Sequence, residues 1–372
     1  MPNQRNEKAK KVAILTNMVA PYRVPFFKEL AKWEQIKKLD ILTCVEREVD
    51  RQWQVENDNS YRTICLSGVT LNLAKGKDAK RILHFRFGII TYLLFKRPDL
   101  LIIGDASWTS FIAAFFCRLF FINYFVWNEI TTTSKVSAGL VANLRHWMYK
   151  GAKHIIASCS MAKDYLLNNA VPNEKISIVN NAVDNDFYLQ QKAKWLPQRA
   201  KLRKALGIEE DSFCFIYVGQ LISRKRVIET VELLAQVNKQ TKVHLIVAGT
   251  GILENEMKDT AAEVKFSNIS FCGYANPARL CQLYTASDAL ILLSEDEPWG
   301  MVVNECLLMG KPYIVSDSVA AGKEFLRRGC LIVDYNFLSL TQVMGFIENC
   351  QSVHDSSVLT PKDMSYEFLK KL

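Results

Sequence analysis

The stretch "ALILLSEDEPWGMVVNECLLMGKPYIVSDS", residues 289–318, decides the fold class. It holds a short apolar run at 289–294, an apolar segment between two glycines, and a second apolar run at 312–317. A strand, a helix and a strand in this order form a unit whose two strands lie parallel. Glu297 follows the first strand, and Glu305 falls in the second turn of the helix. Both carboxylates are therefore expected at the carboxyl edge of the sheet, where open α/β sheets bind ligands.

The same alternation of short apolar runs and helical stretches continues through the chain. Runs of this length without polar alternation suit parallel strands that are covered on both faces. They are expected at 12–17, 39–44, 99–104, 124–128, 154–159 and 176–181, and again at 213–219, 243–249, 269–274, 289–294, 312–317 and 330–335. The predicted fold class is α/β, with two tandem Rossmann-like doubly wound domains facing across a cleft. The expected parts are a first domain at 1–190, a linker with a short helix at 191–211, a second domain at 212–355 and a terminal helix at 356–372.

Composition narrows the class of partner. The chain has 372 residues and a formal net charge of +9, with the basic excess concentrated early, which suggests a polyanionic partner or an anionic membrane face. No helix-turn-helix, zinc or RNA-binding signature accompanies this charge, so nucleic acid is not expected. The ten cysteines form no Cys-x-x-Cys pair, so a zinc site is not expected. Five of them lie in strand-like apolar runs, which favours a reducing compartment. No resident cofactor is expected. The expected location is cytoplasmic.

Two segments raise the question of membrane contact. The run 110–127 is the most apolar, but it is short for a bilayer span, and we predict a buried helix followed by a buried strand. The segment 74–98 combines seven Lys or Arg residues with many large apolar ones. It is expected to be either a core-facing helix with a solvated basic face or a helix that docks on the inner face of a membrane.

Glycines and cations recur where strands of the second half are expected to end. Glycine lets a ligand approach the backbone, and lysine and arginine suit phosphate oxygens. The glycines are Gly219, Gly249, Gly251, Gly273 and Gly300, and the cations include Arg224 and Lys225, although residues 224–226 also read as a solvated charge run. Carboxylates accept hydroxyl groups, so a diphosphate flanked by two sugars, that is, a nucleotide sugar, is the inferred ligand.

These motifs resemble a known family. The Glu-x7-Glu spacing in "EPWGMVVNE" and the segment "YVGQLISRKRVIETVELLA" resemble the nucleotide-sugar domain of retaining family 4 glycosyltransferases, which have the GT-B fold. The segments "VPNEKISIVNNAVDNDFY" and "ILTNMVAPYRVPFFKELA" resemble parts of the first domain, the latter in a bacterial polysaccharide-building branch.

The resemblance implies a role for each matching residue. Glu297 would bind the donor sugar, Glu305 the ribose, and Lys225 with Arg224 the diphosphate. The remaining substrate-binding candidates are Gly219, Gln220, Gly249, Gly251, Gly273 and Tyr274 in the loops, the backbone of Gly300, Met301 and Val302, and Pro21 and Arg23 in a first-domain loop over the phosphates. Transfer would proceed by departure and attack on one face of the sugar, with the donor phosphate helping to deprotonate the acceptor.

The sequence departs from the family pattern at three positions. Gln220 stands where the family usually has Arg, and Arg226 where it usually has Gly. The family's loop His is absent, and "VWNEITTTS" offers Asn128 and Glu129 instead. We expect Glu129 near the reacting sugar, so the catalytic candidates are Glu297, Glu129 and Lys225.

The resulting hypothesis is a retaining hexosyltransferase, peripheral on the inner membrane face, that extends a lipid-linked glycan such as lipopolysaccharide. Two alternatives stay open. One is an epimerase or hydrolase of the same fold, and the other is a non-catalytic nucleotide-sugar-binding scaffold.

Overall fold

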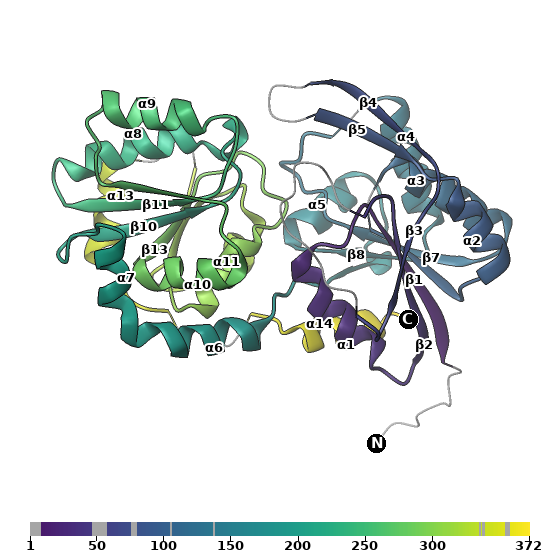
Figure 1. The fold of residues 1–372 in the computed structure, drawn as a ribbon. Coiled ribbons are helices and arrows are strands. Elements are labelled where there is room, and N and C mark those ends of the chain that lie inside the picture. The colour runs from purple at the N-terminus through teal and green to yellow at the C-terminus, as the bar shows by residue number, and fades with distance from the viewer. Residues whose placement is uncertain are drawn as a thin grey trace. The chain divides into compact units, whose positions relative to one another are not determined.

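The computed structural model describes residues 9–46, 58–75, 80–104, 106–136, 138–334, 336, 339–353 and 358–372. The chain divides into two compact units (Figure 1). The first comprises the residues up to Val183 together with Leu359–Leu372, and the second comprises Asp184–Val358. Within the described residues, no helix is both long and apolar enough to cross a membrane.

The first unit is built on a seven-stranded sheet with the order β3-β2-β1-β6-β7-β8-β9, in which every neighbouring pair is parallel. The strands are β1 Lys10–Thr16, β2 Ile36–Thr43, β3 Arg62–Cys65, β6 Leu100–Ile103, β7 Asn123–Asn128, β8 His154–Ala157 and β9 Ile176–Ile178. The helices are η1 Pro21–Arg23, α1 Val24–Ala31, α2 Gly88–Lys96, α3 Trp108–Leu119, α4 Leu140–Gly151, α5 Ser160–Asn168, η2 Asn173–Lys175 and α14 Pro361–Leu369.

The second unit is built on a six-stranded parallel sheet with the order β12-β11-β10-β13-β14-β15. The strands are β10 Phe213–Val218, β11 Val243–Ala248, β12 Ile269–Gly273, β13 Ala289–Leu292, β14 Tyr313–Ser316 and β15 Leu331–Val333. The helices are α6 Asn185–Trp195, η3 Leu196–Gln198, α7 Arg199–Ala205, η4 Ser223–Lys225, α8 Val227–Asn238, α9 Glu254–Glu263, α10 Pro277–Ala286, α11 Met301–Leu308, α12 Ala320–Glu324 and α13 Leu340–Glu348. The α/β class and two Rossmann-like domains are thus confirmed.

The boundary between the parts differs from the expectation. Residues 191–211 are not an extended linker, because α6, η3 and α7 make most of them helical, and they belong to the second unit from Asp184 onward. The side chain of Asp184 begins this helical stretch by accepting a hydrogen bond from the Phe187 amide at 3.0 Å, the contact of a helix cap. The polar composition of the stretch misled the prediction, because its arginines are used for internal bonding.

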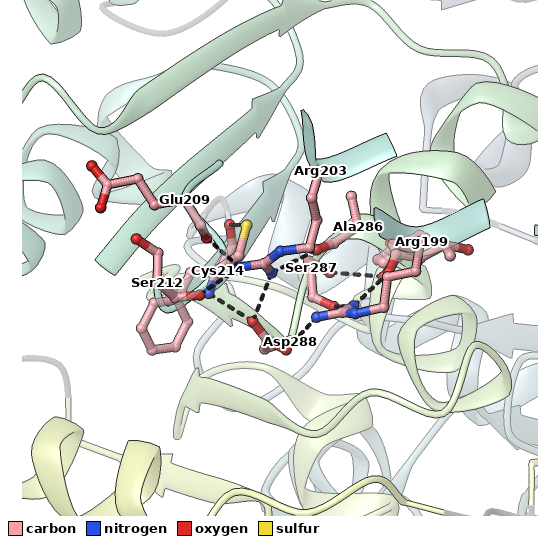
Figure 2. A network of polar contacts seen from close by, with 11 residues as sticks. Arg199, Arg203, Glu209, Ser212, Cys214, Ala286, Ser287 and Asp288 are labelled. Atoms are coloured by element: carbon pink, nitrogen blue, oxygen red, sulfur yellow. Dashed lines mark hydrogen bonds and ion pairs between the residues drawn. The ribbon is translucent and has the colours of Figure 1, made fainter. Parts of the chain in front are cut away.

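An arginine network attaches α7 to the sheet of the second unit (Figure 2). Arg199 and Arg203 both pair with Asp288, with nitrogen to oxygen distances of 2.6 and 3.2 Å. The second Asp288 oxygen accepts the Cys214 amide of β10 at 2.8 Å. Arg203 also donates to the carbonyl oxygens of Ala286, Glu209 and Ser212. The two arginines of α7 are therefore turned inward, whereas Lys201 and Lys204 are exposed.

The terminal helix α14 completes the core of the first unit. The Phe368 ring lies 4.9 Å from that of Phe26 and 5.0 Å from that of Trp127, measured between centroids. The Trp33 indole donates to the Ser365 hydroxyl at 2.8 Å. Figure 1 shows α14 beside α1, although almost the whole chain separates them in sequence. Residues 354–357, at the start of the expected terminal helix, lie outside the described part.

The segment 74–98 is not a single helix. Val69–Lys75 forms β4 and Lys80–Phe85 forms β5, an antiparallel pair, and only α2 is helical. Arg86 is buried and donates to the Thr70 hydroxyl at 2.8 Å, so part of the basic charge serves the interior. A helix was predicted here because the segment lacks the alternation of apolar and polar residues that marks a strand. In the structure residues 82–85 are all partly buried, so neither face of β5 is clearly buried or exposed. Residues 76–79 lie outside the described part. The helix and strand expected in 110–127 are confirmed as α3 and β7.

Candidate functional site

The carboxyl edge of the second sheet gathers the predicted loops. Because β10 to β13 are parallel, Gly219, Gly249 and Gly273 and the loop after β13 all lie at this one edge. Gln220 follows Gly219 in the same loop, and Tyr274, which follows Gly273, is exposed. The parallel order of the strands thus brings together loops that are far apart in the sequence.

Lys225 and Glu297 form the centre of this edge. The Lys225 ammonium donates to Glu297 Oε2, and the two side chains are only 10% and 17% exposed. Lys225 ends the short helix η4, and Glu297 is fixed through its backbone by a bridge to Val319. The pair thus joins the loop after β10 to the loop after β13.

Arg224 holds the same two loops through backbone groups. Its guanidinium donates to the Asp296 carbonyl at 2.7 Å, and its own carbonyl accepts the Glu295 amide at 2.8 Å. Arg224 therefore has a structural task in this state, and it positions the segment that carries Glu297. Its expected phosphate contact stays a prediction.

The glycines of the loop after β11 serve close packing between backbones. A Cβ at Gly249 would lie 1.8 Å from the Gly219 carbonyl oxygen, and one at Gly251 would lie 2.2 Å from the Leu221 carbonyl oxygen. The Leu221 amide donates to the Thr250 carbonyl at 3.0 Å. Two loops at the edge therefore run against each other, which explains these glycines without a ligand. Ligand contact at Gly249 and Gly251 stays a prediction.

Gly273 and Gly300 are required by their backbone conformation. Their φ angles are +64° and +95°, in the left-handed region that favours glycine. Gly300 begins α11, so the amides of Met301 and Val302 lie in its first turn, where a helix presents unpaired N–H groups. This is the geometry that the sequence predicted for anion contact.

Glu305 lies on the inner side of α11 between two tyrosines. The Tyr284 hydroxyl of α10 donates to Glu305 Oε2 at 3.0 Å, and the Tyr188 hydroxyl of α6 also bonds the carboxyl group. Burial raises the pKa of Glu305 to about 7, while the two tyrosine bonds pull this pKa downward. Glu305 is therefore a carboxyl group that changes charge near neutral pH. No sequence pattern pointed to Tyr188 or Tyr284, because each lies on a different helix from Glu305.

The raised pKa of Glu305 predicts a specific pH dependence of stability. A carboxyl group whose folded pKa exceeds its unfolded value contributes stability below about 4.5 and loses it as the pH rises through about 7. Against Glu305→Gln, which stays neutral, wild type is expected to lose free energy of unfolding between pH 5 and pH 8. Urea unfolding of both proteins at several pH values measures this difference. Parallel profiles for the two proteins would contradict the assignment, and Tyr284→Phe should move the window upward.

The backbone at Arg226 has a conformation that favours glycine. Its φ is +52° and ψ is +44°, a left-handed conformation that precedes α8. Its guanidinium pairs with Glu295 at 3.2 Å, which holds the loop before Glu297. The side chain thus combines backbone strain with a contact to the candidate site.

Arg226→Gly is expected to raise the free energy of unfolding by about 0.5–1 kcal/mol, because glycine removes the left-handed strain at the cost of two partly exposed ion pairs, with Glu295 at 3.2 Å and with Glu229 at 4.0 Å. Urea unfolding measures the change. Arg226→Lys keeps the strain and is the matched control, and it should not stabilise the protein. A stability loss in the glycine variant would show that the ion pairs outweigh the strain.

The first unit carries a separate cluster at the carboxyl edge of its own sheet. Pro21 lies at the start of η1, and Arg23, which ends it, is buried with its guanidinium 4.2 Å from the centroid of the Trp127 ring. Arg23 Nη2 lies 2.7 Å from Glu129 Oε2, and the Asn181 amide donates to Glu129 Oε1 at 2.8 Å. Two segments, η1 and the stretch after β9, therefore orient one carboxylate, whose side chain is 29% exposed.

Asn128 does not share this arrangement. It is buried, it accepts the Tyr149 hydroxyl at 2.8 Å, and it donates to the Ile130 carbonyl at 2.9 Å. Its amide is thus occupied in shaping the loop, and Glu129 is the residue of this pair that reaches the edge. Asn181 is an orienting residue that sequence reasoning missed.

No group of three or more metal-ligating side chains occurs in the part of the chain that the structure describes. The absence of a metal requirement stays a prediction.

Comparison with known proteins finds a family match within the second unit. Residues 198–336 match the model of the family described as Glycosyl transferases group 1. The chain is 22% identical over 169 residues to an uncharacterized glycosyltransferase of Methanocaldococcus jannaschii, covering 45% of this chain and 43% of that protein. It is 27% identical over 189 residues to the alpha-galactosylglucosyldiacylglycerol synthase of Streptococcus pneumoniae, covering 48% of each. The matches thus span about half the length of these curated relatives.

A solved structure shares the whole fold. The Anabaena protein HepE, in complex with UDP and glucose, superposes with a TM-score of 0.72 at 13% identity, covering 97% of this chain and 98% of that one. At this identity the likeness establishes the fold alone, which is the GT-B fold.

Proposed function

We propose that this protein is a retaining glycosyltransferase that moves a hexose from a nucleotide diphosphate sugar to a glycan acceptor. The observation that carries the proposal is the Lys225–Glu297 pair at the carboxyl edge of the second sheet, with Glu305 on the helix that follows. A cation, a carboxylate and the first turn of a helix provide complementary groups for phosphate oxygens and sugar hydroxyls. The family match of the same residues supports this assignment.

The proposed roles come from the family resemblance, and the contacts support them. An ammonium group has three donors, so Lys225 can keep its bond to Glu297 and stabilise the negative charge on the departing diphosphate. Glu297 accepts hydroxyl groups of the transferred sugar, and ionised Glu305 accepts those of the ribose. The bond between the anomeric carbon and the phosphate oxygen breaks while the acceptor oxygen bonds the same face, and the acceptor proton passes to the phosphate.

The first unit supplies the acceptor side in this proposal. Arg23 and Asn181 hold Glu129 as an oriented carboxylate, which suits positioning of a sugar hydroxyl. Among the relatives, the Streptococcus pneumoniae synthase is named for a glycolipid, which supports a lipid-linked acceptor. A cytoplasmic location on the inner face of a membrane and a role in surface polysaccharide synthesis belong to the same proposal.

Calorimetric binding tests the donor site. The full chain is titrated with UDP, GDP and ADP and with their common sugars, with and without Mg²⁺, and the titration is repeated with Lys225→Ala and Glu305→Ala. We expect one nucleotide to bind selectively, more weakly in both variants and equally without Mg²⁺. No binding by folded protein would reject the donor site and favour a scaffold. Release of free sugar at the same rate with and without acceptor would favour a hydrolase.

A further inference from the structure

Exposed apolar side chains gather at the ends of two neighbouring helices of the first unit. Phe121 is 94% exposed and Phe95 is 76% exposed, which is unusual for phenylalanine. We call the full set the aromatic tip: Leu94, Phe95, Phe115, Leu119 and Phe121. These residues come from the last turns of α2 and α3 and from the turn after α3.

The aromatic tip is continuous because the two helices end side by side. The Arg97 guanidinium, just after α2, donates to the Phe120 carbonyl just after α3 at 3.1 Å. Figure 1 shows α2 and α3 adjacent on the outer side of the first sheet. On α3 the inner face, with Phe111, Ala114 and Cys117, is already buried. The apolar residues of its outer face therefore have no role in the core.

The backbone at the aromatic tip favours glycine but carries larger residues. Phe121 has a φ of +56° and Arg97 a φ of +40°, both in the left-handed region. Ala170 and Lys265 also adopt it, so the conformation alone is not special. A phenylalanine in this conformation that is almost fully exposed gains nothing from internal packing. A strained residue of this kind points to a function outside the fold.

The charges around the aromatic tip have one dominant sign. Between Lys80 and Asn128 the sequence has six Lys or Arg residues and two Asp. Lys96, Arg97 and Arg118 border the aromatic tip and are exposed. Asp99, one of the two acids, accepts the Lys11 amide at 2.7 Å.

The amino edge of the same sheet, into which α2 and α3 lead, extends the basic surface. A pocket of about 450 Å³ opens there, lined by Lys10, Lys11, Lys37 and Lys153 together with Asp99. The start of β7 also lines this pocket, two residues after Phe121. Apolar and basic surface therefore meet at one edge of the first unit.

We propose that the aromatic tip inserts into the surface of an anionic phospholipid bilayer, with Lys96, Arg97 and Arg118 contacting the headgroups. Exposed aromatic side chains bordered by cations suit a membrane interface, whereas a protein partner would be expected to meet charges of both signs. The sequence analysis suggested a helix at 74–98 for membrane docking, and we assign membrane docking to the aromatic tip instead. This proposal deepens the membrane part of the proposed function, but its test requires no transferase activity, so either can fail alone.

Cosedimentation of the full chain with vesicles tests the proposal. Wild type is expected to bind vesicles of phosphatidylcholine with one third phosphatidylglycerol, and to bind pure phosphatidylcholine vesicles at least about tenfold more weakly, with the difference shrinking in high salt. Phe121→Gly removes the ring and supplies the residue that its backbone favours. It should fold at least as stably and lose about tenfold in vesicle affinity.

The matched control is Lys265→Gly, which makes the same backbone change in the second unit, and it should bind vesicles like wild type. Phe95→Ser should weaken binding as Phe121→Gly does. Equal binding of Phe121→Gly and wild type, or equal binding to both kinds of vesicle, would overturn the proposal. A concentration-dependent dimer in analytical ultracentrifugation that Phe121→Gly abolishes would also overturn it, by showing that a second copy covers the aromatic tip.

Discussion

Lys225→Met is expected to lower kcat/KM about 10²–10³-fold in a transferase assay with the donor that binds. The magnitude is that of removing one donor that stabilises developing negative charge in a water-poor site. The side chain is only 10% exposed and is joined to Glu297, so its charge acts close to the reacting groups rather than through solvent. Steady-state kinetics with the purified chain measure the change.

A second substitution at Glu297, the partner of Lys225, distinguishes an effect on catalysis from an effect on stability. Lys225→Met leaves the Glu297 carboxylate without its cation, which is expected to reduce the free energy of unfolding by up to about 3 kcal/mol. The double variant Lys225→Met with Glu297→Gln removes both charges and should recover much of that stability but none of the activity. Recovery of activity in the double variant would mean that Lys225 only neutralises Glu297. A single variant with normal kcat/KM would remove Lys225 from the reaction.

Asp288→Ala is expected to have the largest effect on stability. The carboxylate receives both arginines of α7 and the amide of β10, so its loss leaves Arg203, which is 10% exposed, with an uncompensated charge (Figure 2). Breaking such a pair costs about 3 kcal/mol. For a unit of this size that lowers Tm by roughly 6–12 °C.

Differential scanning calorimetry of the full chain measures the shift. The control is Asp211→Ala, which removes a carboxylate from an exposed pair with Lys242 and should leave Tm unchanged. Asp288→Asn keeps one acceptor and should fall between wild type and alanine. An Asp288→Ala protein that melts like wild type would show that the carbonyl contacts of Arg203 hold α7 without the carboxylate.

Twelve of the thirteen strands in the two parallel sheets could be predicted because each is a short apolar run, whereas β3, Arg62–Cys65, is mostly exposed and was not expected. All twelve expected strands are present, and the edge that carries Glu297 follows from their parallel order. The sequence also placed Glu305 in its helical turn. These features depend on local pattern and on one topological rule.

What the sequence could not predict depends on contacts between distant segments. The polar stretch around Arg199 and Arg203 resembles a linker until the carbonyls that receive these arginines are known. Tyr188 bonds Glu305 although more than a hundred residues separate them in sequence. No local pattern predicts that a tyrosine will shift the pKa of a distant carboxyl group. The antiparallel pair β4–β5 was missed because its side chains are neither clearly buried nor clearly exposed.

The return of α14 to the first unit has a consequence for the order in which the chain matures on the ribosome. Met364 and Phe368 complete a core whose other buried members emerge before Val183, so this core stays open until the intervening 175 residues, Asp184–Val358, have been made. At ordinary rates of translation that interval is roughly 10–35 s. The second unit is one continuous stretch and can close as soon as it leaves the exit tunnel. The half that is synthesised first is therefore expected to finish folding last, and meanwhile it depends on chaperones to shield Phe26 and Trp127.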